Sequence, residues 1–155
     1  MEELFFELKQ KVYEKLDINL DVSDEEVIDV CIYEISQHRA ISVHNRELLR
    51  QQLYNSIKRL DILQELLEDD DITEIMINGY KDIFIEKKGR ITKWNKQFES
   101  REKLEDIAQR IAAMSNKTIN EAIPIVDTRL ADGSRVNMVL SPIAIDGPVI
   151  TIRKF

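Results

Sequence analysis

Apolar side chains recur every three or four positions along roughly the first sixty residues. This spacing predicts three amphipathic helices that bury their apolar stripes against one another as a small bundle. Ser23 and Glu26 form a capping box that starts the second helix, and Asn45 is expected to cap the third. The stripes comprise Phe5, Leu8, Val12 and Leu16; Val27, Val30, Cys31 and Ile35; and Leu48, Leu49, Leu53, Ile57 and Leu60.

A shorter apolar segment follows, and it predicts a short fourth helix that starts at Asp61 and ends in the acidic run Glu68–Asp71. Because runs of like charge are usually solvated, we interpret this run as the junction between two regions. We expect an N-terminal helical region over residues 1–60 and an α+β domain over residues 61–155, which includes the short fourth helix.

Beyond the acidic run the apolar positions alternate with polar ones, which is typical of strands with one buried face. Ser100 is expected to cap a long helix between the strands. The predicted class is α+β: about three N-terminal helices, then a mostly antiparallel sheet of about six strands with one long helix on a face. The strands are expected around Ile75–Ile77, Ile83–Ile85, Ile91–Trp94, Ile125–Leu130, Arg135–Leu140 and Val149–Lys154.

The dipeptide Asp132-Gly133 marks a hairpin between two of these strands. A two-residue loop would pair Leu130 with Arg135 and mix apolar and charged groups on both faces. A three-residue loop, Ala131-Asp132-Gly133, separates them, so we choose this register. One face then carries Val126, Thr128, Leu130, Val136, Met138 and Leu140, and the other carries Asp127, Arg129, Arg135 and Asn137.

In this register Arg129 and Arg135 are direct cross-strand neighbours, and like charges placed opposite each other are destabilising by up to ~1 kcal/mol. Asp127 could relieve part of the repulsion, which would make the face an ordinary salt-bridge surface. Alternatively the arginines await an anion, because arginine forks suit phosphate oxygens. The hairpin alone favours the salt-bridge surface. Arg153 would join the pair where the last strand lies beside the hairpin.

Charge, cysteine content and hydrophobicity exclude several classes of protein. The formal net charge of -7 argues against a surface whose main task is to neutralise nucleic-acid phosphates, but it leaves room for a local basic patch. The single cysteine, Cys31, fits a reducing compartment and is expected to be buried and inert. The acidic start lacks the positive charge of a signal peptide, and no apolar run approaches the ~20 residues of a membrane helix. A cytoplasmic protein is expected.

The chemistry of catalysis is absent from the sequence. None of the 4 glycines lies in a G-x-x-x-x-G-K-[ST] loop, so nucleotide phosphates cannot be held in the P-loop manner. His38 and His44 have no cysteine or acidic cluster at metal-ligand spacing. No serine or cysteine lies in a nucleophile motif. We expect neither a metal site nor catalysis by this chain alone.

Three segments resemble, in the same order, the N-terminal domain of CpaF-like ATPases of the type II/IV secretion superfamily, which power protein transport and tight-adherence pilus assembly. Residues 66–79 resemble the beginning of that domain. Residues 129–137, RLADGSRVN, resemble its signature R-L-x-D-G-S-R-V-N. Residues 146–155, DGPVITIRKF, resemble the segment in which it ends. Three matches over roughly the last ninety residues are more specific than any one of them.

The resemblance implies a hexameric ring in which ATP and Mg²⁺ lie between this domain and a C-terminal RecA-like ATPase domain. It also implies that N-terminal-domain arginines reach the phosphates, and on this sequence Arg135 and Arg153 fit best, followed by Arg129. With the resemblance included, the anion site is preferred to the salt-bridge surface. Because the chain stops at Phe155, before the expected Walker loop, we expect a truncated piece with no cofactor of its own.

The resemblance also implies partners: the protein's own C-terminal ATPase domain, neighbouring subunits of a homohexamer, and an inner-membrane platform protein. Attachment to the inner membrane would be peripheral, through such partners. The alternative function is a non-catalytic interaction module that docks a membrane platform protein, with a purely structural arginine face. A helix-turn-helix nucleic-acid binder is disfavoured by the acidic balance and the lack of a basic recognition helix, so no nucleic-acid partner is expected.

Overall fold

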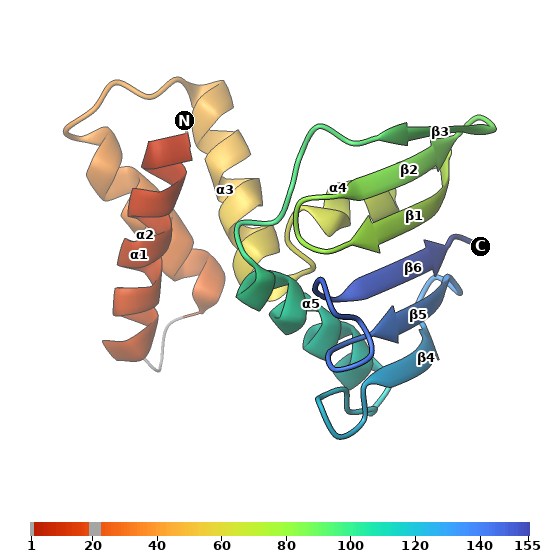
Figure 1. The fold of residues 1–155 in the computed structure, drawn as a ribbon. Coiled ribbons are helices and arrows are strands. Elements are labelled where there is room, and N and C mark those ends of the chain that lie inside the picture. Colours follow the sequence, from red (N-terminus) through yellow and green to blue (C-terminus); the bar gives the residue numbers. More distant parts are fainter. Residues whose placement is uncertain (1, 19–22) are drawn as a thin grey trace. The chain divides into compact units, whose positions relative to one another are not determined.

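The computed structural model describes residues 2–18 and 23–155. The chain forms two compact units, Met1–Asp61 and Ile62–Phe155 (Figure 1). Within the described residues, none of the helices is both long and apolar enough to cross a membrane.

The first unit is a bundle of three helices, α1 (Glu2–Ile18), α2 (Asp24–Ser36) and α3 (Val43–Lys58). Its core is the predicted one in outline, because each helix contributes part of its apolar stripe. Ser23 caps α2 as predicted, with its Oγ accepting the N–H of Glu26 at 3.2 Å. The buried core consists of Leu8, Val12, Val27, Ile28, Cys31, Ile32, Ile35, Leu49 and Leu53.

Three details of the bundle differ from the sequence prediction, and one is that Leu48, expected in the apolar stripe of α3, is exposed. Ser42 caps α3, and its Oγ accepts the N–H of Asn45 at 3.1 Å, so Asn45 receives the cap instead of providing it. Val30 is 45% exposed, because it lies about 100° around the helix from Cys31. Ile28 and Ile32 are buried in its place, since α2 packs against both α1 and α3.

The second unit is a six-stranded sheet with two helices. All five neighbouring strand pairs are antiparallel, in the order β3-β2-β1-β6-β5-β4. The α+β class predicted from the sequence is therefore confirmed. The elements are α4 (Leu63–Glu68), β1 (Ile72–Asn78), β2 (Ile83–Lys87), β3 (Arg90–Lys93), α5 (Arg101–Met114), β4 (Ile125–Arg129), β5 (Arg135–Val139) and β6 (Val149–Arg153).

One face of this sheet is apolar and buried. Alternate residues of the central strands are inaccessible to solvent, as are five residues along one side of α5, so the two surfaces form the core of the unit. Ser100 caps α5 as predicted, accepting the N–H of Lys103 at 3.1 Å. The core includes Ile75, Ile77, Val136, Met138, Ile150 and Ile152 from the strands and Leu104, Ile107, Ala108, Ile111 and Ala112 from α5. The opposite face of the sheet remains available for function.

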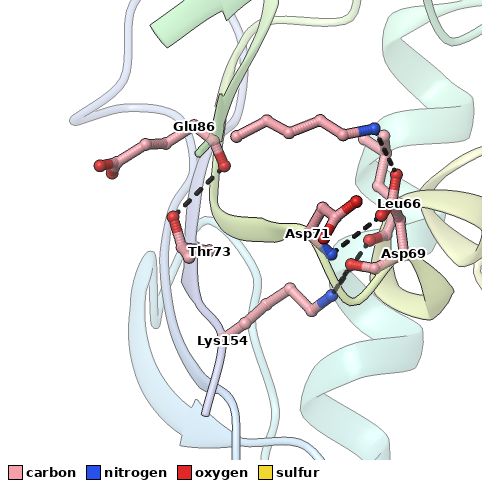
Figure 2. A network of polar contacts seen from close by, with 7 residues as sticks. Leu66, Asp69, Asp71, Thr73, Glu86 and Lys154 are labelled. Carbon is pink, nitrogen blue, oxygen red and sulfur yellow. Dashed lines mark hydrogen bonds and ion pairs between the residues drawn. The ribbon is translucent and has the colours of Figure 1, made fainter. Parts of the chain in front are cut away.

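The acidic run belongs to this unit and is not a junction, which corrects the sequence interpretation. Figure 2 shows Lys154, at the end of β6, donating to the backbone carbonyls of Leu66 (3.4 Å) and Asp69. The Asp69 carboxylate accepts from Lys87 at 3.0 Å and from the N–H of Asp71 at 3.0 Å. The hydrogen bond from Lys87, followed by that from Asp71, lowers the pKa of Asp69. The run is thereby fastened to the sheet, and the boundary between the units precedes Ile62.

Candidate functional site: a row of arginines across the sheet

The hairpin between β4 and β5 has the predicted three-residue loop. Leu130 donates its N–H to the carbonyl of Ser134 at 2.9 Å, and Arg129 lies directly opposite Arg135. Gly133 adopts φ of +89°, a left-handed conformation that favours glycine over side-chain-bearing residues. This register confirms the separation of apolar from charged positions that was inferred from the sequence.

The arginines continue from the hairpin onto β6. Arg135 pairs with Arg129 on β4 and with Arg153 on β6, and Arg153 pairs in turn with Glu74 on β1. Directly paired residues share a face of the sheet, so the three side chains project from the face opposite the core. We name Arg129, Arg135 and Arg153 the arginine row. The sequence could not settle whether Arg153 joined it, and the strand order shows that it does.

The pairing places these side chains on directly adjacent positions of neighbouring strands. The hydrogen bond from Leu130 to Ser134 identifies a hydrogen-bonded pair, so the next pair, Arg129 and Arg135, is a non-hydrogen-bonded one. Cα atoms in such pairs lie only about 4.5 Å apart. Arg135 then directs its backbone groups toward β6 and forms a hydrogen-bonded pair with Arg153, with Cα atoms about 5.5 Å apart.

No carboxylate in the described part of the chain lies within ion-pair distance, 4.0 Å, of the arginine row. Asp127, the residue that could have relieved the repulsion, instead accepts a hydrogen bond from Asn137 Nδ2 at 2.7 Å. Two adjacent pairs of like charge each cost up to ~1 kcal/mol. A cationic row with this cost and no bound carboxylate is suited to receive an anion.

The row lines a shallow hollow of about 630 Å³ on the exposed face of the sheet. Four cations and two carboxylates contribute to its lining, so the hollow is positive although the chain carries a net charge of -7. Its lining consists of Glu74, Ser115, Lys117, Asp127, Thr128, Arg129, Arg135, Val136, Asn137, Thr151 and Arg153.

The segment that follows α5 contributes two polar residues that the sequence analysis did not identify. Ser115 Oγ donates to the backbone carbonyl of Arg129 at 3.1 Å, and Lys117 Nζ donates to that of Asp127. Both carbonyls belong to β4, the edge strand of the sheet. Nothing local in the sequence signals this contact, because it depends on where the end of α5 meets the sheet edge.

The histidine, cysteine and acidic side chains of the described residues offer no competing metal or nucleophile site. No group of histidine, cysteine, aspartate and glutamate side chains in residues 2–18 and 23–155 could hold a metal ion. Cys31 is buried in the helical bundle, and burial raises the pKa of its thiol. His38 and His44 are both exposed. The hollow over the arginine row is the candidate functional site.

Comparisons with known proteins agree with this fold. Residues 56–155 match the family described as type II/IV secretion system protein. The uncharacterized protein MJ0781 of Methanocaldococcus jannaschii is 36% identical over 104 residues, which are 66% of this chain and 14% of that protein. A crystal structure of the VirB11 ATPase from the Brucella suis type IV secretion system, in complex with sulphate, superposes with a TM-score of 0.55.

The likeness to VirB11, at 24% sequence identity over 60% of this chain and 29% of that one, shows a shared fold. The chain thus spans a small part of the length of both proteins. The family match covers the whole of the six-stranded sheet and both of its helices. This chain belongs to the type II/IV secretion system protein family.

Proposed function

We propose that this chain is the N-terminal domain of a secretion or pilus-assembly ATPase, and that its arginine row contacts nucleotide phosphates. The observation that carries the proposal is the run of three adjacent cations, from β4 to β6, without a carboxylate within ion-pair distance among the described residues. Each guanidinium presents a planar fork of donors that matches phosphate oxygens. Arg135 is central, because it has a row arginine on both sides.

The mechanism assigned to the row is electrostatic. Phosphate oxygens bring negative charge to a place where two repulsive contacts already exist, so binding removes repulsion as well as adding charge-assisted hydrogen bonds. Such bonds are worth about 1.5–3 kcal/mol when they are shielded from water. The row carries no P-loop, so hydrolysis would be performed by a separate ATPase domain with its own Mg²⁺. This domain would sense the nucleotide and transmit its presence.

Within the family, we assign the complete protein to the CpaF-like motors. Such a motor would be a cytoplasmic homohexamer that docks on an inner-membrane platform protein. The segment RLADGSRVN, which forms the hairpin of the arginine row, supports this assignment by its resemblance to the CpaF-like signature. The VirB11 protein of similar fold is itself described as an ATPase of a secretion system. ATP would lie between the arginine face and the ATPase domain.

The helical unit favours a second, compatible function as a docking module. Its helices expose apolar side chains, with Tyr33 66% exposed and Val43 73% exposed. These side chains are available to contact a protein partner. In this alternative the unit binds the platform protein and the arginine face is purely structural.

The experiment is steady-state ATP hydrolysis by the complete protein that contains this chain, comparing wild type, Arg135→Ala and Arg90→Ala. Arg90 is the matched control, since it is exposed on β3 at the opposite edge of the sheet. We expect kcat/KM to fall about tenfold or more for Arg135→Ala, because a charge-assisted phosphate contact is lost. Arg90→Ala should retain wild-type turnover. Unchanged turnover in Arg135→Ala would leave the arginine face structural and favour the docking function.

A further inference from the structure

A fourth cation reaches the hollow from outside the strands. α5 ends in a Schellman motif: Lys117 donates its N–H to the carbonyl of Ala112 at 2.9 Å, and Asn116 donates to Ala113 at 3.0 Å. Asn116 takes the left-handed conformation at φ of 55°, which asparagine tolerates better than most residues. The end of the helix therefore sets the direction of the chain and positions Lys117 beside β4.

The Lys117 ammonium is held at the sheet edge with donors to spare. It has three N–H donors, and the structure assigns one of them to the backbone carbonyl of Asp127. Ser115 holds the same edge through the carbonyl of Arg129, so its hydroxyl proton is already used. Lys117 lines the hollow together with the arginine row and can donate to a ligand without leaving its anchor.

The arrangement of the cations defines the ligand class. Neighbouring strands lie about 4.7–4.9 Å apart, so the side chains that start on β4 and β6 begin almost 10 Å from each other. Lys117 extends the cationic set past β4, at the outer edge of the sheet. A single phosphate offers its oxygens at one point along such a line, whereas linked phosphates offer them along its length.

We propose that Lys117 and the arginine row form one binding site for linked phosphates, complete within residues 1–155. This inference rests on the proposed function and deepens it, because Lys117 becomes a phosphate contact. The site binds the phosphate chain and makes no contact with the nucleoside. Free polyphosphate and the triphosphate tail of a nucleotide share this chemistry. Lys117 sets the β4 end of the site and Arg153 sets its other end.

The test is isothermal titration of the chain with tripolyphosphate, ATP, AMP and orthophosphate at low and moderate salt. We expect tripolyphosphate and ATP to bind within about threefold of each other, and orthophosphate and AMP at least about tenfold more weakly. Equal affinity for orthophosphate and tripolyphosphate would overturn the linked-phosphate site. Much tighter binding of ATP than of tripolyphosphate would overturn the claim that the site reads phosphates alone.

Lys117→Gln tests the lysine itself, because glutamine keeps an N–H donor at the end of its side chain but carries no charge. We expect an unchanged melting temperature, a loss of tripolyphosphate affinity of about fivefold or more, and a weaker dependence of affinity on salt. Lys81→Gln is the matched control, since Lys81 is an exposed lysine on the β1–β2 loop. This variant should bind tripolyphosphate as wild type does.

The outcomes separate this inference from the proposed function. If Lys117→Gln binds as wild type does while Arg135→Ala loses affinity, Lys117 is only an anchor of the sheet edge and the arginine site stands. If Lys117→Gln lowers the melting temperature and leaves affinity intact, the inference is likewise overturned. If wild type binds none of the four anions, the linked-phosphate site is refuted. The turnover of Arg135→Ala in the complete protein then decides the proposed function independently.

Discussion

Arginines at three neighbouring positions in one row of a sheet work against the stability of the fold that carries them. Each adjacent like-charge pair is unfavourable, and Asp127 directs its carboxylate to Asn137 instead of toward them. Stabilisation of the unit comes from the opposite face, where Val136 and Ile152 are almost fully buried. The two faces of the same strands therefore have separate roles, one in folding and one in binding.

Replacing Arg135 with alanine is expected to leave the stability of the chain unchanged or slightly higher. The side chain is exposed and has no carboxylate within ion-pair distance among the described residues, while its removal relieves repulsion on both sides. The free energy of unfolding in urea should stay within about 0.5 kcal/mol of wild type or rise. Val136→Ala, one position along and buried, should lose about 1–3 kcal/mol. A loss of that size for Arg135→Ala would identify a structural residue.

Elements whose geometry is decided locally could be predicted from the sequence. The β4–β5 register could be predicted because only the three-residue loop separates apolar from charged positions. The capping of α2 by Ser23 could be predicted because the capping box is a local signal. Ser42 and Asn45 are both good capping residues three positions apart, so the start of α3 was ambiguous.

Contacts between distant elements could not be predicted in this way. Arg153 joins the row because β6 returns to lie between β1 and β5, which no local pattern specifies. The acidic run was misread for the same reason. Its partners are Lys87 and Lys154, and Lys154 lies 85 positions along the chain from Asp69. Lys117 reaches β4 through the same kind of long-range contact.

The contact between the end of β6 and the end of α4 gives a prediction about how these elements stabilise the sheet unit. Lys154→Met keeps the apolar stem but removes the ammonium that binds the carbonyls of Leu66 and Asp69. We expect a loss of about 1–3 kcal/mol in the free energy of unfolding, because partly buried carbonyls lose their charged donor. The measurement is urea unfolding, with Lys88→Met, at the exposed β2–β3 turn, as the control. Equal stability of the two variants would show that Lys154 does not fasten the acidic run.

At the scale of the whole molecule, the chain combines a helical unit with an apolar core of its own and a sheet unit that carries the cationic hollow. The family match covers the sheet unit and only the end of the helical one. Composition alone argued against a surface that neutralises nucleic-acid phosphates, since the net charge is -7, and it could not locate a local cationic patch. Strand pairing overrides that average by gathering three arginines into one row, and Lys117 joins them from the end of α5.

The measurement that tests the central claim most directly is NMR of the ¹⁵N-labelled chain titrated with tripolyphosphate, following the arginine Nε–Hε signals. We expect the signals of Arg129, Arg135 and Arg153 to shift together along one saturating curve. Arg46 and Arg50, in the helical unit, should stay in place. Arginine-to-lysine variants of the row would assign the signals. Row signals that do not move, or equal small shifts of every arginine in the chain, would contradict an anion site at the arginine row.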